Sequence, residues 1–126
     1  MDIYQKYKEN SVLSMSPAEQ LLLLYDEADK QLARASMCLE EEEYVLFDKS
    51  MERTSNIIRY LLQILDMEQP ISRDLERIYH YLLYDIGRIV AGRKRYIDEI
   101  PRIRHILSEL RDAFDQASRI VAAEKR

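Results

Sequence analysis

The chain has 126 residues, a length that suits one domain with a single core and is too short for two ordinary domains. Only two glycines and three prolines occur among abundant leucine, isoleucine, glutamate and arginine, so the composition favours helices. No alternating β-branched run bounded by turn residues predicts a strand. The formal charge of −4 argues against a protein that wraps duplex nucleic acid, because such a protein needs a basic surface.

Targeting and redox features indicate a cytoplasmic protein. The first residues lack the basic segment and apolar core of a signal peptide, and no stretch approaches the roughly 18 consecutive apolar residues of a membrane-spanning helix. The single cysteine, Cys38, cannot form an intrachain disulfide. We expect its thiol to fill a small apolar space near the end of the first long helix.

The first long helix is predicted over residues 17–39, directly after Ser16. Ser16-Pro17-Ala18-Glu19 is a capping box with proline at the first helical position. The Ser16 hydroxyl should accept a hydrogen bond from the backbone N–H of Glu19, and the Glu19 carboxylate should accept one from the N–H of Ser16. The core-facing residues at steps of three and four are Leu21, Leu24, Tyr25, Ala28, Leu32, Ala35 and Leu39.

Four consecutive leucines, Leu21 to Leu24, follow the start of this helix. Their side chains sweep about 300° around the helix axis, at about 100° per residue. A helix packed on one side normally buries a stripe of only about 100°. Leu22 and Leu23 must therefore be covered by another segment of this chain or by another molecule.

Three further helices are predicted over residues 44–65, 71–91 and 98–121. Each has an apolar stripe at helical spacing. The stripes are Phe47, Met51, Thr54, Ile58, Leu61 and Leu65, with Ile57 and Leu62 beside them; then Leu75, Ile78, Tyr79, Leu82, Ile86, Ile89 and Val90; and finally Ile100, Ile103, Leu107, Leu110, Phe114, Ala117 and Val121.

The connections between these helices contain recognisable breaks. The acidic run Glu40–Glu43 is typical of a solvated turn, and Pro70 disfavours helix at the residue before it. Gly92 with the following cations suits the end of a helix, and Asp98 can cap the next one. Short connections favour antiparallel neighbours, so we predict an all-α, antiparallel up-down four-helix bundle over 16–121. A leader over 1–15 is expected to form a short helical cap or strap, and 122–126 a frayed tail.

Residues for catalysis, metal binding or cofactor binding are not evident. A ferritin-like site needs Glu-x-x-His motifs, but Arg77 and Arg102 stand three residues before the two histidines. Glu76 with His80, and His105 with Glu109, are best interpreted as exposed pairs. Cys38 lacks the surroundings of a nucleophile, and two glycines cannot form a phosphate-binding loop. The basic segment from Arg88 to Arg104 is interpreted as a solvated interhelical loop in preference to a phosphate site.

Nine tyrosines occur in the chain. Tyr25 and Tyr79 fall on core stripes, so we expect their rings to be packed in the core with the hydroxyl at its rim. Tyrosines that lie off the stripes or at their edges include Tyr60, Tyr81, Tyr84 and Tyr96. Exposed tyrosines combine apolar area with a hydrogen-bonding group, which suits recognition of another chain.

Several motifs resemble those of the flagellin export chaperones of the FliS type. The opening segment over residues 10–26 is similar to the family's N-x-V-x-T-A-S-P-x-E motif, followed by an aliphatic run and Tyr-Asp. Further matches lie in each later helix, so the resemblance spans nearly the whole chain. These matches are Ile57-Ile58-x-x-Leu61, Leu65-Asp66, Leu75-x-x-Ile78-Tyr79-x-Tyr81-Leu82 and Leu107-x-x-Leu110-Arg111-Asp112-Ala113-Phe114.

The resemblance implies a helical bundle with a small N-terminal cap and a non-enzymatic function without cofactors. It implies that the protein binds the disordered C-terminal segment of flagellin in the cytoplasm, prevents premature polymerisation and delivers the subunit to a component of the flagellar type III export gate. Residues 3–7 are expected to shield part of the binding groove in the free protein. The expected client contacts are Tyr4, Tyr7, Val12, Leu13, Leu22, Leu23, Tyr25, Ile57 and Tyr81.

Two alternatives remain open at this level. The chain has the features of a helical adaptor that binds an amphipathic helix of another secretion or regulatory protein. A weak homodimer in the absence of client, burying Leu22 and Leu23 against a second copy, is a purely structural explanation of the apolar excess.

Overall fold

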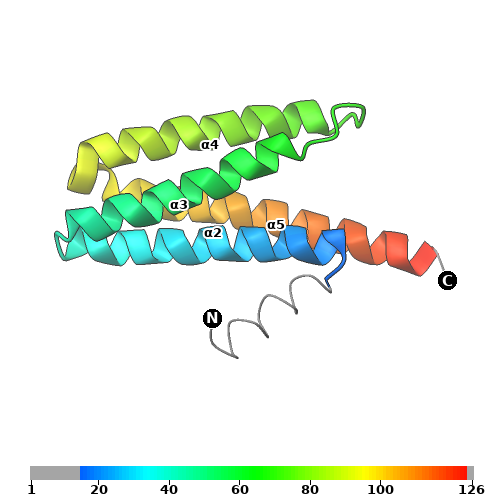
Figure 1. Ribbon diagram of the computed structural model, residues 1–126, viewed down its shortest axis with the longest axis horizontal. Helices are drawn as coiled ribbons and strands as arrows, with labels where there is room; N and C mark the ends of the chain where they lie inside the picture. The colour runs from blue at the N-terminus through cyan, green and yellow to red at the C-terminus, as the bar shows by residue number, and fades with distance from the viewer. Residues whose placement is uncertain (1–14, 125–126) are drawn as a thin grey trace, which may run out of the picture.

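The computed structural model describes residues 15–124, and over this range it contains helices and turns but no strand (Figure 1). The all-helical fold class is therefore confirmed. The elements are α2 (Pro17–Glu40), α3 (Tyr44–Gln63), α4 (Ser72–Gly92), the 3-10 segment η1 (Arg93–Glu99) and α5 (Ile100–Glu124). The expected N-terminal cap lies outside the described residues.

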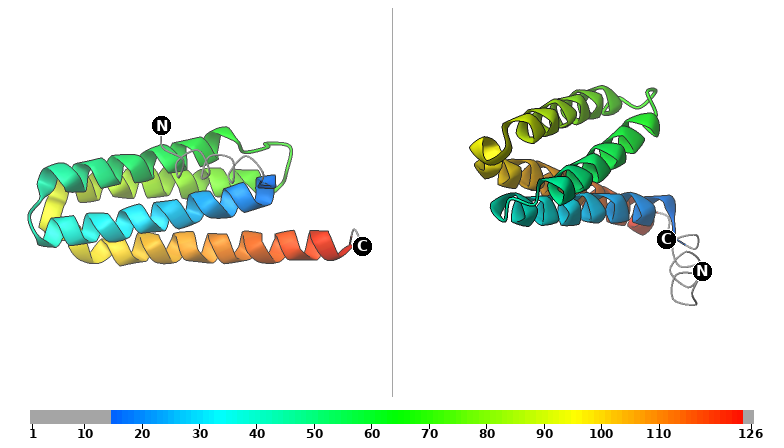
Figure 2. Two further views of the ribbon diagram at one scale, coloured as in Figure 1. Left: turned by 60° about the horizontal axis from the view of Figure 1, so that its bottom comes forward. Right: turned by 60° about the vertical axis from the view of Figure 1, so that its left-hand side comes forward.

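Helices that follow one another along the chain run in opposite directions, as the colours of Figure 1 show. The backbone of α2 lies close to those of α3 and α5, whereas α4 approaches α3 and η1. Its backbone stays farther from α2 and α5, and the right-hand view of Figure 2 shows α4 set apart from α2. A regular four-helix bundle thus stays a prediction, because α4 does not pack closely along the length of α5.

The start of α2 is capped by Ser16, as predicted. The Ser16 Oγ accepts a hydrogen bond from the backbone N–H of Glu19 at 3.2 Å, and Pro17 occupies the first turn. The Glu19 carboxylate accepts from the Ser16 hydroxyl at 3.1 Å. The side chains therefore pair with each other, where we had expected the carboxylate to bind the backbone N–H of Ser16.

The segment between α4 and α5 differs from the prediction. Asp98 lies inside η1, and α5 begins only at Ile100, so the prediction that Asp98 caps the last helix was wrong. The helix α4 ends at Gly92 because Arg93 takes a positive φ of 56°. A Cβ at Gly92 would lie 2.1 Å from the Tyr96 ring, so glycine permits this ring to fold back against the end of α4.

The hydrophobic core runs through the middle of the molecule. On α2 the predicted stripe is buried from Tyr25 onward, and Leu21 and Leu24 pack half-buried against it. The core also includes Cys38, which is buried and unpaired as expected. Other fully buried side chains include Leu32, Leu39, Phe47, Met51, Ile58, Leu61, Leu82, Ile86, Ile89 and Ile100.

Burial along α5 stops earlier than its stripe predicted. Among its apolar residues Leu107 is the last buried one, Phe114 is half-buried, and Ala117 and Val121 are exposed. Assigning Ala117 and Val121 to the core stripe was therefore wrong, because α5 projects beyond the helices that would cover them (Figure 1). Among the helices that the structure describes, none combines the length and apolar character needed to cross a membrane.

Candidate functional site

Apolar hollows gather at one end of the molecule, where α2 and α4 begin and α3 and α5 approach their ends (Figure 1). The largest set of lining residues belongs to a hollow between α3 and α4, which we call the α3–α4 hollow. Its lining includes Leu21, Leu61, Ile64, Leu65, Ile71, Ser72, Leu75, Tyr79 and Phe114. All four α-helices or the turns beside them therefore contribute to it.

A second apolar hollow lies between the start of α2 and the projecting part of α5, and we call it the α2–α5 groove. It is lined by Ala18, Leu21, Phe114, Ala117, Ser118 and Val121. Leu21 and Phe114 line both hollows, so the two form one continuous apolar surface. Ile120 and Val121 are 59% and 48% exposed beside it, which is unusual for large aliphatic side chains on one helix end.

A third hollow opens between α2 and α3. Leu23 and Leu24 from α2 face Tyr60 from α3 across it, with Gln20 at its rim. Leu23 is 40% exposed and Tyr60 is 49% exposed. The predicted surplus of leucine surface therefore exists at Leu23, next to an exposed tyrosine.

Two tyrosines form the base of this end of the molecule. Tyr25 and Tyr79 are almost fully buried, and their hydroxyl groups form a hydrogen bond to each other. The Tyr25 ring stacks on Phe114, with their centroids 5.8 Å apart. Burial raises the pKa of Tyr25 and of Tyr79 above the usual value, which keeps both hydroxyls neutral. The expected packing of both rings in the core is confirmed. The expected position of the hydroxyls at its rim was wrong, because both hydroxyls are buried and each has the other as its partner.

The predicted contact residues occupy different environments. Leu22 and Ile57 are half-buried, and Leu23 is exposed. Tyr25 is buried, and its ring stacks on Phe114, which lines two of the hollows. Tyr81 is exposed, and its hydroxyl accepts a hydrogen bond from Arg102. The other four predicted contacts, Tyr4, Tyr7, Val12 and Leu13, lie outside the described residues.

Several hollow-lining residues were not among the predicted contacts. Ile64 and Ile71 flank the turn between α3 and α4, and their exposure depends on where both helices end. Phe114 and Val121 had been placed on a core stripe. No local sequence pattern shows that α5 extends beyond the helices packed against it. Tyr60 did carry a signal, because it falls off the apolar stripe of α3.

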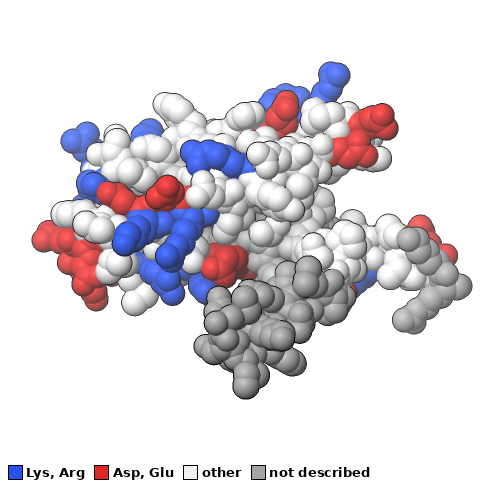
Figure 3. Space-filling view, viewed as in Figure 1, with Lys and Arg blue, Asp and Glu red and all other residues white. Residues whose placement is uncertain are grey.

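Charged residues lie mostly outside the apolar surface. In Figure 3, basic and acidic side chains interleave at the left and lie again at the upper right, over the start of α4, whereas the surface between α4 and the projecting end of α5 is mostly uncharged. Arg104 pairs with Asp29 at 2.8 Å, and Arg111 pairs with Asp26 at 2.6 Å, joining α5 to α2.

The basic segment from Arg88 to Arg104 is not the solvated loop that we predicted. Its backbone is helical, and four of its arginines are held by carboxylates of other elements: Arg88, Arg93, Arg102 and Arg104. Arg93, for example, pairs with Asp48 of α3 and lies over the ring of Tyr44. A segment in which most cations are already paired offers little free charge to a phosphate.

No group of three or more metal-binding side chains comes together within residues 15–124. His105 lies 3.0 Å from Glu109 on the exposed face of α5, which confirms the interpretation of this pair as a surface contact. The chemistry that the site offers is apolar contact with another chain. Apolar hollows of this composition are typical of the class of small helical proteins that bind amphipathic segments of a partner.

Comparison with known proteins makes this class specific. The family described as flagellar protein FliS matches residues 1–121, and the chain belongs to this family. The chain is 28% identical over 113 residues to the flagellar secretion chaperone FliS of Salmonella typhimurium strain LT2, covering 87% of this chain and 82% of that protein. It is 25% identical over 114 residues to the flagellar secretion chaperone FliS of Bacillus subtilis strain 168, covering 90% of this chain and 84% of that protein. The family supports an export chaperone role with a flagellar client.

Proposed function

We propose that this protein is a cytoplasmic export chaperone that binds the disordered C-terminal segment of flagellin, prevents premature polymerisation and delivers the subunit to the flagellar type III export gate. The observation that carries the proposal is the continuous apolar surface formed by the α3–α4 hollow and the α2–α5 groove. Catalysis, metal ions and cofactors have no part in this function. The family relationship supports the client class.

The physical basis is burial of apolar surface that neither partner can bury alone. A disordered segment with amphipathic stretches stays unfolded by itself but forms helices when its apolar faces enter a groove. The hollows have aliphatic and aromatic walls with few charges. Such walls suit apolar helix faces of the client and place few demands on their exact sequence. Each additional Å² of apolar area removed from water contributes roughly 25 cal/mol.

The proposed contact set combines the expected residues with those of the hollows. Leu22, Leu23 and Ile57 would contact client beside Tyr60, and Tyr81 would lie farther along α4. Tyr25 would support the site from below, since its ring is buried against Phe114. The leader residues Tyr4, Tyr7, Val12 and Leu13 complete the proposed set, and residues 3–7 would act as a displaceable cover.

The central experiment is titration of the purified chain with a flagellin C-terminal peptide, followed by calorimetry and circular dichroism. We expect sub-micromolar binding, a gain in helix content and a negative heat-capacity change, because folding and apolar burial occur together. A titration without heat or helix gain would refute the flagellin proposal. It would favour an adaptor that binds another amphipathic helix.

A leucine pair separates client contact from core packing. Leu23→Ala removes an exposed side chain from the hollow beside Tyr60, so we expect peptide binding to weaken about fivefold to thirtyfold with little change in melting temperature. Leu32→Ala removes a fully buried side chain and should lower the free energy of unfolding by about 2–5 kcal/mol. Unchanged binding by Leu23→Ala would exclude this leucine from the client surface.

The cover proposed for residues 3–7 and the homodimer have their own tests. Deletion of residues 1–12 should increase self-association, because it removes the proposed cover from apolar surface. It should also change the peptide affinity, because it removes a cover that lowers the apparent affinity together with the proposed contacts Tyr4, Tyr7 and Val12. If both quantities stay the same, the leader is not a cover. Sedimentation at increasing concentration without peptide measures whether a second copy occupies the apolar surface.

A further inference from the structure

The two ends of α4 are attached to the rest of the molecule in different ways. Its first turns contribute Ser72, Leu75 and Tyr79 to the wall of the α3–α4 hollow. Its last turns are tied to η1 and α5 by charged side chains. Between these points the backbones of α4 and α5 do not pack closely together.

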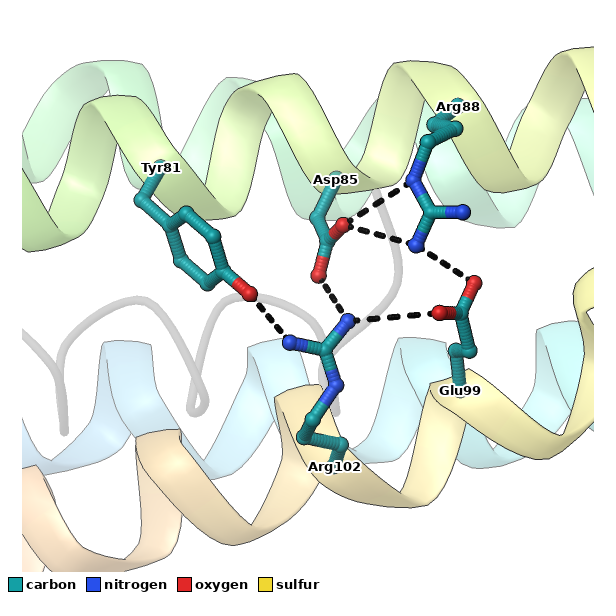
Figure 4. Close-up of polar contacts among 5 residues, drawn as sticks. All are labelled: Tyr81, Asp85, Arg88, Glu99 and Arg102. Carbon is teal, nitrogen blue, oxygen red and sulfur yellow. Dashed lines mark hydrogen bonds and ion pairs between the residues drawn. The ribbon is translucent and has the colours of Figure 1, made fainter.

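The tie is a cluster of five side chains, shown in Figure 4, which we call the Asp85 cluster. Asp85 is 2% exposed, and its two carboxylate oxygens accept hydrogen bonds from Arg88 on α4 and from Arg102 on α5. The Arg88 guanidinium also binds Glu99, which in turn lies 3.7 Å from Arg102. Tyr81 completes the cluster, since its hydroxyl accepts from Arg102.

The interactions within this cluster resist rotation of α4 against α5, so the cluster acts as a rigid joint between the two helices. Two guanidinium groups and two carboxylates balance in charge, and each arginine contacts both carboxylates. Planar guanidinium groups bind carboxylates in fixed directions, so rotation of α4 against α5 would misalign several charge-assisted bonds together. A buried carboxylate that loses its partners is strongly unfavourable, which keeps the joint closed.

Because the Asp85 cluster lies far along α4 from the α3–α4 hollow, a small rotation at the cluster moves the wall of this hollow. Ser72 lies 13 residues before Asp85, about 20 Å along the helix at 1.5 Å per residue. A rotation of α4 by about 10° at Asp85 would therefore move its first turn by roughly 3 Å. A change of this size is comparable with the width of a methyl group, enough to alter which side chains the hollow accepts.

We propose that Asp85 is a positioning residue that fixes the angle between α4 and α5 and thereby sets the width of the α3–α4 hollow for its client. The inference rests on the proposed function for its client and on the cluster geometry for the fixed angle. Asp85 itself lines none of the three hollows, so its effect on the width of the α3–α4 hollow acts through the placement of Leu75 and Tyr79.

The test measures the angle and the affinity separately. Spin labels are attached at Arg77→Cys on α4 and Gln116→Cys on α5, both exposed, in a Cys38→Ala background, and their separation is measured without peptide. We expect a narrow distance distribution in this parent chain and a broadened or shifted one after Asp85→Asn. We also expect Asp85→Asn to weaken flagellin-peptide binding at least tenfold, measured well below its melting temperature.

The matched control is Asp29→Asn, which removes the pair with Arg104 between α2 and α5. We expect this variant to keep the label distance and the peptide affinity of the parent chain, even where its melting temperature is lower. Such a result separates a joint that positions α4 from an ion pair that only stabilises the fold. Arg102→Lys, which retains the charge without the planar fork, replaces Asp85→Asn if that variant does not fold, and the same changes are expected.

An unchanged distance distribution in both cluster variants would overturn the fixed-angle proposal. A changed distance with unchanged affinity would overturn its link to the client. A parent chain that does not bind the peptide would overturn the proposed function and the client part of this inference, while the label distances would still decide whether the Asp85 cluster fixes the angle.

Discussion

At the scale of single residues, some buried polar groups pair with partners that are distant in sequence. Tyr25 and Tyr79 are 54 residues apart, yet each supplies the hydrogen-bond partner that the other hydroxyl needs. Asp85 similarly depends on Arg102 from the next long helix. Such pairs make the relative placement of helices specific, because a shifted helix would leave a buried polar group unpaired.

The tyrosine pair predicts a stability loss at alkaline pH. Their pKa values are raised by burial, so above about pH 10 the unfolded chain releases tyrosine protons that the folded chain retains. The free energy of unfolding should therefore decrease with rising pH above this value, by up to about 1.4 kcal/mol per pH unit for each proton that the folded chain retains. Tyr25→Phe should reduce this slope by one tyrosine's share in urea titrations between pH 8 and 11.

The control for this prediction is Tyr84→Phe, which removes the hydroxyl of a tyrosine that is 71% exposed. This variant should retain the slope of the parent chain. The slopes are compared, and not the absolute stabilities, because Tyr25→Phe also leaves the buried Tyr79 hydroxyl without its partner. Equal slopes for Tyr25→Phe and the parent chain would contradict the prediction.

At the scale of the elements, the helices are formed by local signals and placed by long-range contacts. The Ser16 cap starts α2 where the capping box predicted it, and Gly92 ends α4. The two glycines have different roles. Gly92 accommodates the Tyr96 ring, whereas a Cβ added at Gly87 would meet no atom within 4 Å.

This difference predicts opposite effects of two alanine substitutions. Gly87→Ala should raise the free energy of unfolding by about 1 kcal/mol, because glycine in the interior of a helix is less favourable than alanine by this amount. Gly92→Ala should lower it, since the new Cβ would overlap the Tyr96 ring that packs beside Arg88. Urea unfolding measures both, and a stabilised Gly92→Ala would show that the Tyr96 ring moves without cost.

At the scale of the whole molecule, the contacts that stabilise the fold and the surface proposed for the client lie along different parts of α5. The buried part of α5 ends at Leu107, while the apolar residues beyond it line the α2–α5 groove or remain exposed. The ion pairs that join α5 to α2 and α4 involve Arg102, Arg104 and Arg111. The projecting end of α5 therefore contributes little to folding and much to the proposed client surface.

Truncation tests this separation. A chain ending at Gln116 loses the groove wall formed by Ala117, Ser118 and Val121, so we expect about tenfold weaker flagellin-peptide binding. Its free energy of unfolding should change by less than about 1 kcal/mol, as for other surface changes. A chain ending at Ala122 retains this wall and should bind as the full chain does. Equal affinity of both truncated chains would remove the α2–α5 groove from the client surface.

Sequence reasoning succeeded where the determining interactions are local. The helical composition, the Ser16 cap, the stripe on α2 and the family motifs all depend on residues within a few positions of one another. It failed at Asp98 and over the basic segment up to Arg104. The conformation there depends on the Tyr96 ring and on carboxylates from other helices.

The candidate site was predictable only in part for the same reason. A run of four leucines requires exposed apolar surface because a helix cannot bury all its faces against one neighbour, and Leu23 is indeed exposed. Which other residues join it depends on where each helix ends in space. Ile71 and Val121 are exposed through the offsets between helices.

By itself the sequence determined that this chain is helical, which family it resembles and that it holds more apolar surface than one helical layer covers, because periodicity and capping act over single turns. Only the tertiary structure decided that α5 extends beyond its neighbours, that Tyr25 pairs with Tyr79 and that the Asp85 cluster joins α4 to α5. These features arise from contacts between residues far apart in the chain, whose partners no local pattern specifies.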